Sequence, residues 1–148
     1  MSEKLVDNVF GELEFDYDWV KDSKQKIFGR EFDIDIIVEG NDENNSIREE
    51  QRESFKKFQV NNSEIIKRVE LVVFEYDQTV RKEQSMIEIK FSEVSDKIIL
   101  SGIIFPVVLE DGELSIGFLF ESDSEPEHGI GIKITDEEIE VGNQDILI

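Results

Sequence analysis

The chain has no cysteine, two prolines, one histidine and one tryptophan among its 148 residues. The absence of cysteine excludes disulfide scaffolds, thiolate metal sites and a cysteine nucleophile. Residues 1–14 lack a basic start followed by an apolar run, so we expect no signal peptide. No stretch approaches the ~18 apolar residues of a membrane-spanning helix. These absences predict a soluble, cytoplasmic protein without a membrane partner.

Basic residues are also scarce, because 16 Lys and Arg stand against 36 Asp and Glu and leave a net charge of −20. The excess of acidic over basic residues lies toward the two ends of the chain. Residues 1–45 carry 13 acidic and 5 basic side chains, residues 46–109 carry 11 and 10, and residues 110–148 carry 12 and 1. Such a field repels nucleic acid and attracts basic proteins. We therefore expect a basic protein partner and no nucleic acid, with plain solubility as the alternative explanation of the charge.

The remaining composition is sufficient for a core, since hydrophobic residues make up 39% of the chain and eleven of them are Phe. A chain of this length fits one domain, which we place over residues 1–148. Alternating apolar and polar residues predict strands within about 9–38 and again within about 86–148. Helical spacing predicts two helices, at about 46–58 and 63–81. Segregated strands and helices predict an α+β fold, a mainly antiparallel sheet with the central helix pair packed on one face.

Several local signals refine these elements. Ser46 and Glu49 match a capping box at the start of the first helix. Gly29 predicts a tight turn between two strands, and the Asp-Gly within residues 110–113 predicts a hairpin turn. Pro106, inside an apolar run, predicts an edge strand or a bend. Two short strands are expected at the end of the chain, at 138–141 and 145–148.

The single histidine ends an acidic stretch whose charged members are Glu121, Asp123, Glu125, Glu127 and His128. Zinc sites take mainly His and Cys ligands, which one histidine without cysteine does not supply. Catalysis by His128 would need a nucleophile motif such as GxSxG, which is missing. We expect no catalytic residue, no metal and no cofactor. The stretch is interpreted as a strand–loop–strand connection, with Gly129 and Gly131 at a turn and a bulge, whose side chains contact a partner.

A second candidate contact lies near the start of the chain, at Asp16 and Trp19. Phe15, Tyr17 and Trp19 alternate with Asp16 and Asp18, which predicts one strand continuing through Trp19. A tryptophan beside carboxylates has the composition of a protein-binding patch. Packing of the three aromatic side chains on the sheet is the alternative interpretation.

Motifs at both ends of the chain carry a family resemblance. They are FGELEFDYDW at 10–19, FGREFDI at 28–34 and the helix REEQRESFKKF, and at the other end PEHGIGIKI at 126–134 and EVGNQDILI at 140–148. This set resembles a family of uncharacterised bacterial domains, some of whose members look like cognate immunity proteins of polymorphic toxins. The resemblance implies a small bacterial accessory protein, and it implies no metal or cofactor.

The leading hypothesis is a non-enzymatic immunity protein that neutralises a basic toxin domain by occlusion. One alternative is a small hydrolase or metal-dependent enzyme that uses His128 with neighbouring carboxylates. Another is a structural accessory protein whose copies associate through the apolar strand 98–105. We expect a monomer or a weak homodimer.

Overall fold

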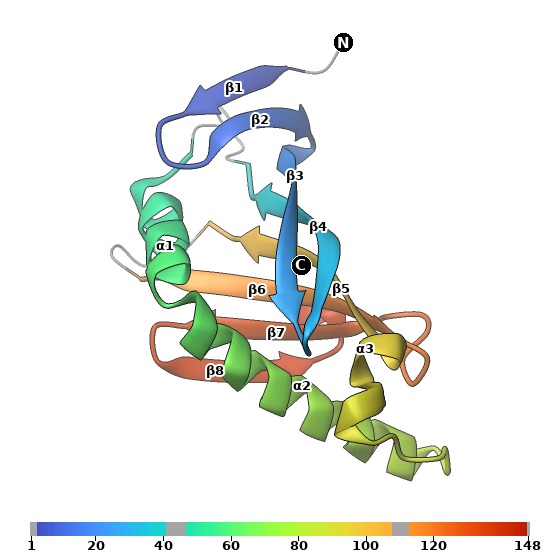
Figure 1. Cartoon of the computed structure of the whole chain (residues 1–148). Coiled ribbons are helices and arrows are strands. Elements are labelled where there is room, and N and C mark those ends of the chain that lie inside the picture. Colours follow the sequence, from blue (N-terminus) through green and yellow to red (C-terminus); the bar gives the residue numbers. More distant parts are fainter. Residues whose placement is uncertain (1–2, 41–46, 108–112, 148) are drawn as a thin grey trace.

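Eight strands form one mixed sheet in the computed structural model, which describes residues 3–40, 47–107 and 113–147. The strand order follows the sequence from β1 to β8. Every neighbouring pair is antiparallel except β4 and β5, which run parallel. The sheet is therefore two four-stranded meanders joined side by side (Figure 1).

The helices lie in the connection between the two meanders. The first meander contains β1 (Lys4–Asp7), β2 (Gly11–Asp16), β3 (Asp18–Ile27) and β4 (Arg30–Val38). The connection contains α1 (Glu49–Val60), α2 (Asn62–Glu83), a 3-10 turn η1 (Phe91–Glu93) and α3 (Val94–Lys97). The second meander contains β5 (Ile98–Phe105), β6 (Ser115–Ser122), β7 (Ile130–Thr135) and β8 (Glu138–Gly142), followed by a 3-10 turn η2 (Gln144–Leu147). Parallel strands need such a crossover connection. The predicted α+β class is confirmed.

Strand β4 shows how the sheet acquires two unlike faces. Phe32, Ile34 and Ile36 are buried, whereas the intervening Asp33 and Asp35 are exposed. Paired residues on neighbouring strands share a face, so the register extends this division across the sheet. We call the buried side the helix face, because α1 and α2 pack there, and the other side the open face.

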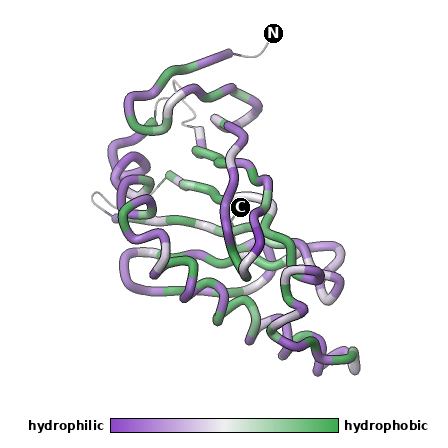
Figure 2. The backbone as a smooth tube through the Cα atoms, in the orientation of Figure 1, coloured by the Kyte–Doolittle hydropathy of each residue, from purple (hydrophilic) through white to green (hydrophobic). Residues whose placement is uncertain are grey.

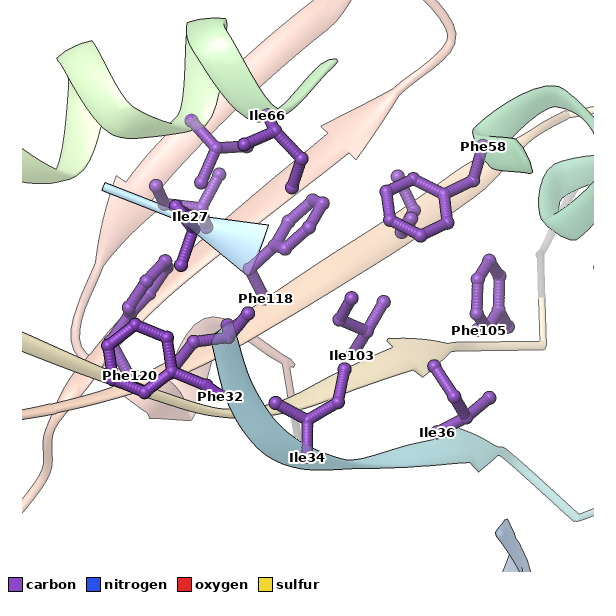
Figure 3. Packing of buried hydrophobic residues seen from close by; sticks show 14 of the residues in the cluster. Ile27, Phe32, Ile34, Ile36, Phe58, Ile66, Ile103, Phe105, Phe118 and Phe120 are labelled. Carbon is purple, nitrogen blue, oxygen red and sulfur yellow. The ribbon is translucent and has the colours of Figure 1, made fainter. Parts of the chain in front are cut away.

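The core lies between the helix face and the two helices. Figure 3 shows Ile66 of α2 and Phe58 of α1 directed toward sheet residues such as Phe118. The rings of Phe58 and Phe118 are 5.9 Å apart in an edge-to-face arrangement, which favours this packing beyond the area that it buries. Hydrophobic residues dominate β5, β6 and β7, whereas β3 is largely hydrophilic (Figure 2).

The central strands of the second meander are also covered on the open face, by η2. A Cβ atom on Gly117 would lie 2.5 Å from Leu147 Cδ2, and one on Gly131 would lie 2.9 Å from the carbonyl oxygen of Asn143. The Gln144 amide donates to the carbonyl of Phe120 at 2.8 Å. Gly117 and Gly131 therefore make room for the chain to fold back on the sheet.

The first helix begins at Glu49 rather than near residue 46. Its capping interaction comes from Gln51, whose Oε1 accepts from the Arg48 amide at 2.8 Å. The Gln51 Nε2 also donates to the carbonyls of Glu39 and Phe105, both at 2.9 Å. One buried side chain thus joins α1 to the ends of the parallel strands β4 and β5. Ser46, the predicted cap, lies outside the described residues.

The chain reverses at Tyr17, so the prediction of one strand through Trp19 is wrong. Asp16 and Asp18 pair across the turn, and Tyr17 between them has a φ of 67°. Phe15 and Trp19 do share a face, with ring centroids 5.0 Å apart, but Tyr17 is 91% exposed. The two-residue period cannot reveal this reversal, because Phe15 and Trp19 share a face in either arrangement.

Other predictions for the second half of the chain also need correction. No strand is found between residue 86 and Ile98 in the described chain, since residues 91–97 form η1 and α3. Strand β5 is central rather than at an edge, and Pro106 directly follows its last residue. Both edges of β5 are already paired within the sheet, so the expected edge-to-edge pairing of copies through strand 98–105 is wrong.

The end of the chain follows the prediction in part. Strand β8 is found at the predicted place, but η2 replaces the predicted strand at 145–148 up to Leu147. The predicted hairpin turn falls largely on residues 110–112, which lie outside the described residues, as does residue 148. Within the described chain, no helix has the length and apolar character needed to cross a membrane.

Candidate functional site

The last two residues of β6 and most of the connection to β7, residues 121–128, are anchored to α2 by a buried polar network; we call this segment the acidic loop. The hydroxyls of Ser122 and Ser124 donate to Asp77 Oδ1 at 2.6 and 2.5 Å. Arg81 Nε donates to Asp77 Oδ2 at 2.6 Å, and Arg81 Nη2 pairs with Asp123. Asp77 and Ser124 are fully buried. Two turns of one helix therefore fix the position of the loop.

The charges of this network reinforce one another. Burial alone lowers the pKa of Arg81, but its hydrogen bonds to Asp77 and Asp123 outweigh burial and leave that pKa above its usual value. Tyr76 adds a longer hydrogen bond, of 3.4 Å, to the carboxylate of Glu125. A buried charge pair whose hydrogen bonds are satisfied holds a defined geometry. The acidic loop therefore presents its exposed carboxylates from a fixed backbone.

The side chain of His128 projects into solvent at the end of this loop. It is 55% exposed, and its Nε2 lies 3.9 Å from a carboxylate oxygen of Glu127. A shallow concavity of about 360 Å³ beside it is lined by Glu121, Asp123, Glu125, Glu127, His128 and Lys97, among others. Across the described part of the chain, no three His, Asp or Glu side chains converge in a way that could hold a metal ion.

The two glycines after His128 do not both behave as predicted. Gly129 has a φ of 61° and makes the turn. Gly131 keeps regular register opposite Leu119, so the predicted bulge at that position is wrong. The bulge lies instead in β5, between Leu100 and Gly102.

The second predicted contact, Asp16 with Trp19, is only half available to a partner. Asp16 is exposed, but Trp19 is only 5% exposed and packs on the helix face. The expectation of Trp19 as a surface contact is therefore wrong, and the alternative, packing on the sheet, holds for Phe15 and Trp19 but not for Tyr17. Register places Asp16 and Glu121 on the same open face, but near opposite strand ends and four strands apart, which is about 19 Å across the sheet. They do not form one patch.

The open face of the first meander carries an acidic surface that the sequence alone did not reveal. We call it the acidic face: the exposed carboxylates of the open face of the first meander, which leaves out the half-buried Asp18. Its members are Glu12, Glu14 and Asp16 on β2, Asp22 on β3, and Glu31, Asp33 and Asp35 on β4. All seven are exposed, and the lysines on the same face are Lys4, Lys24 and Lys26.

Charge complementarity along the β3–β4 ladder stops at one position. Lys26 stands opposite Glu31, and Lys24 stands opposite Asp33 with 3.5 Å between the charged atoms. The next pair on the open face is Asp22 opposite Asp35. Both carboxylates line a concavity of about 450 Å³, and Lys24, Asp33 and Ser101 also line it, with Lys24 paired to Glu31 and Asp33. The neighbour of Asp35 on β5 is Gly102, which carries no side chain over them. This is the arrangement that would receive a cation.

Asp33 and Asp35 were recognisable from the sequence as the polar side of a strand. Asp22 was not, because its pairing with Asp35 depends on the register of the hairpin. Asp77 and Arg81 were also missed, since a helix pattern does not reveal which loop packs against it.

Comparison with protein-family models shows that residues 9–148 match the model described as a domain of unknown function (DUF6985). Neither the curated proteins nor the solved structures gave a match. The matched segment runs from just before β2 to the end of the chain and so includes the crossover and the acidic loop.

Proposed function

The chain belongs to the family of domains of unknown function DUF6985, and on that premise we propose that it is a non-enzymatic protein that binds a basic protein partner through its acidic face. The most concrete form of this proposal is a bacterial immunity protein. It would neutralise a basic toxin domain by covering the cationic surface that the toxin uses for an anionic substrate.

The pairing of Asp22 with Asp35 carries the proposal. Like charges directly opposite each other destabilise an antiparallel pair. The same ladder places Lys24 and Lys26 opposite acids, so a complementary pair at the third position is compatible with this hairpin. Packing of the fold does not require two carboxylates at an exposed position. An ammonium or guanidinium group from a partner would relieve their repulsion and turn it into attraction.

The rest of the charge acts at longer range. The field of a chain with a net charge of −20 steers a cationic protein toward it and accelerates association. Glu121, Asp123, Glu125 and Glu127 extend the negative potential to the acidic loop. The fixed backbone of the acidic loop lowers the entropy lost on binding, because these groups need little further ordering.

Co-expression with the product of the neighbouring gene tests the proposal. We expect that protein to carry a basic C-terminal domain that stops bacterial growth when expressed alone, and we expect growth to return when this chain is co-expressed. A double variant, Asp22→Asn with Asp35→Asn, should rescue less well than wild type at equal protein levels. A neighbour that is harmless, or is not bound by this chain, argues against an immunity function.

A further inference from the structure

Tyr17 is the most exposed of the large hydrophobic side chains in the described chain, at 91%. It occupies the single position between Asp16 and Asp18, which pair with each other across the turn. A bulky residue at a φ of 67° is a backbone outlier that costs free energy. The ring lies almost entirely in solvent, so packing within the fold offers little compensation for that conformation.

The base of this turn is held from two sides. The rings of Phe15 and Trp19 stack edge to face beneath it on the helix face. On the other side, the carboxylate of Asp18 accepts a hydrogen bond of 3.0 Å from the amide of Gly40, just past the end of β4. The turn is therefore tied to the body of the sheet, and the exposed ring stands on a well-supported backbone.

The groups beside the ring define the chemistry that it can recognise. Asp16 and Asp18 both belong to the open face by register, so the residues on either side of Tyr17 in the chain are carboxylates of one face. A guanidinium group stacks on an aromatic face and also forms paired hydrogen bonds with carboxylates. A lysine ammonium gains less from the same site, because it is a compact, strongly hydrated point charge.

We propose that Tyr17, together with Asp16 and Asp18, binds an arginine side chain of the basic partner, and we call these three residues the arginine anchor. This inference rests on the proposed function and makes it more specific, because the acidic face alone attracts any cation. Tyr17 takes the place of Trp19 as the aromatic contact of this region. Its strained backbone is the structural consequence of placing a ring at the tip of the turn.

Two peptides of equal charge, nona-arginine and nona-lysine, test the inference by isothermal titration calorimetry at low salt. We expect Tyr17→Gly to reduce the preference for nona-arginine over nona-lysine by about 2- to 5-fold, the range of one exposed cation–π contact. Tyr17→Phe should retain the preference, since its ring remains. Ile87→Gly is the matched control, because Ile87 is 88% exposed at another site.

The melting temperature provides the structural check. Glycine adopts a positive φ without strain, and the Tyr17 ring makes little packing contact, so Tyr17→Gly should melt no lower than wild type. An unchanged arginine preference in this folded variant would overturn the inference and leave the proposed function standing. If neither peptide binds the wild-type chain, the proposed function and the arginine anchor are both wrong.

Discussion

At the scale of single residues, buried Asp77 and exposed Asp22 illustrate two different uses of a carboxylate. Asp77 is surrounded by donors and positions a loop, whereas Asp22 faces another carboxylate across the ladder. Both are single aspartates in polar stretches of sequence, so composition does not distinguish them. Burial distinguishes Asp77 and strand register distinguishes Asp22, and each observation leads to a different prediction.

Removing Asp77 should be severely destabilising. Asp77→Ala leaves Arg81 buried without its main partner, and breaking a buried ion pair in this way costs about 3–5 kcal/mol of unfolding free energy. Asp96→Ala is the control, since Asp96 pairs with Arg30 at 3.5 Å but is 74% exposed; its loss should stay below about 1 kcal/mol. Urea unfolding at pH 7 measures both. Equal losses would contradict the account of the acidic loop.

Asp7 should make the fold sensitive to acid. Burial alone would raise its pKa, but hydrogen bonds from Arg52, Phe10 and Val9 outweigh burial and hold the pKa below its usual value. The folded value thus lies below the unfolded one. The ionised carboxylate therefore contributes stability above about pH 4, and this contribution disappears as the pH falls through the folded pKa.

The variant Asp7→Asn should be less stable than wild type at pH 7 and should lose less stability between pH 5 and pH 3, since it no longer takes up that proton. Asp33→Asn is the control, because Asp33 is 88% exposed. Chemical unfolding followed at several pH values provides the comparison. A wild-type acid slope retained in Asp7→Asn would contradict the role assigned to this residue.

At the scale of elements, the turns at Gly29 and Gly129 allow the cost of a positive φ to be measured apart from the cost of steric crowding. Gly29 has a φ of 73° with open space around it, whereas a Cβ on Gly129, at a φ of 61°, would lie 2.5 Å from the carbonyl oxygen of Phe120. Alanine at a positive φ costs about 1–2 kcal/mol. Gly29→Ala should lose about that much in urea unfolding, and Gly129→Ala should lose distinctly more. The reverse order would refute the close packing of the turn at Gly129 against β6.

An element could be predicted where its residues form a clear pattern in the sequence, and could not be predicted where that pattern is too short or ambiguous. The β3–β4 hairpin was largely predictable, because Gly29 marks a turn and β4 alternates between apolar and polar residues from Phe32 to Ile36. The connection between α2 and β5 was not, since η1 and α3 are too short to show a helical period. The central place of β5 also escaped prediction. Pro106 suggested an edge, but it stands just beyond the last residue of the strand, where no ladder hydrogen bond is lost.

At the scale of the whole molecule, the parallel junction of the two meanders determines which acids act together. The crossover places α1 and α2 on the helix face and leaves the open face of the first meander without a helix among the described residues. The sequence predicted a basic partner and an acidic loop. It could not predict that Asp22, Asp33 and Asp35 would form one surface, because that requires strand pairing over long separations in the chain.

We infer that the acidic face, and not net charge as such, binds a basic partner. The direct measurement is the affinity for nona-arginine at 150 mM salt, where charges more than about 8 Å away are largely screened. One variant changes Asp22, Asp33 and Asp35 to Asn. Its control changes three exposed acids in or just beyond α2, Glu75, Glu83 and Glu88, to Gln, so that both lose the same charge.

We expect the acidic-face variant to bind about 10-fold more weakly than wild type, given up to about 1 kcal/mol for each exposed charge contact. The control should change by less than about 2-fold. Removing the repulsion between Asp22 and Asp35 should offset the loss of the exposed ion pair between Asp33 and Lys24, so the acidic-face variant should keep about wild-type stability and unfolding will not explain its weaker binding. Equal weakening of the two variants would show that bulk charge alone attracts the peptide, and would contradict the account.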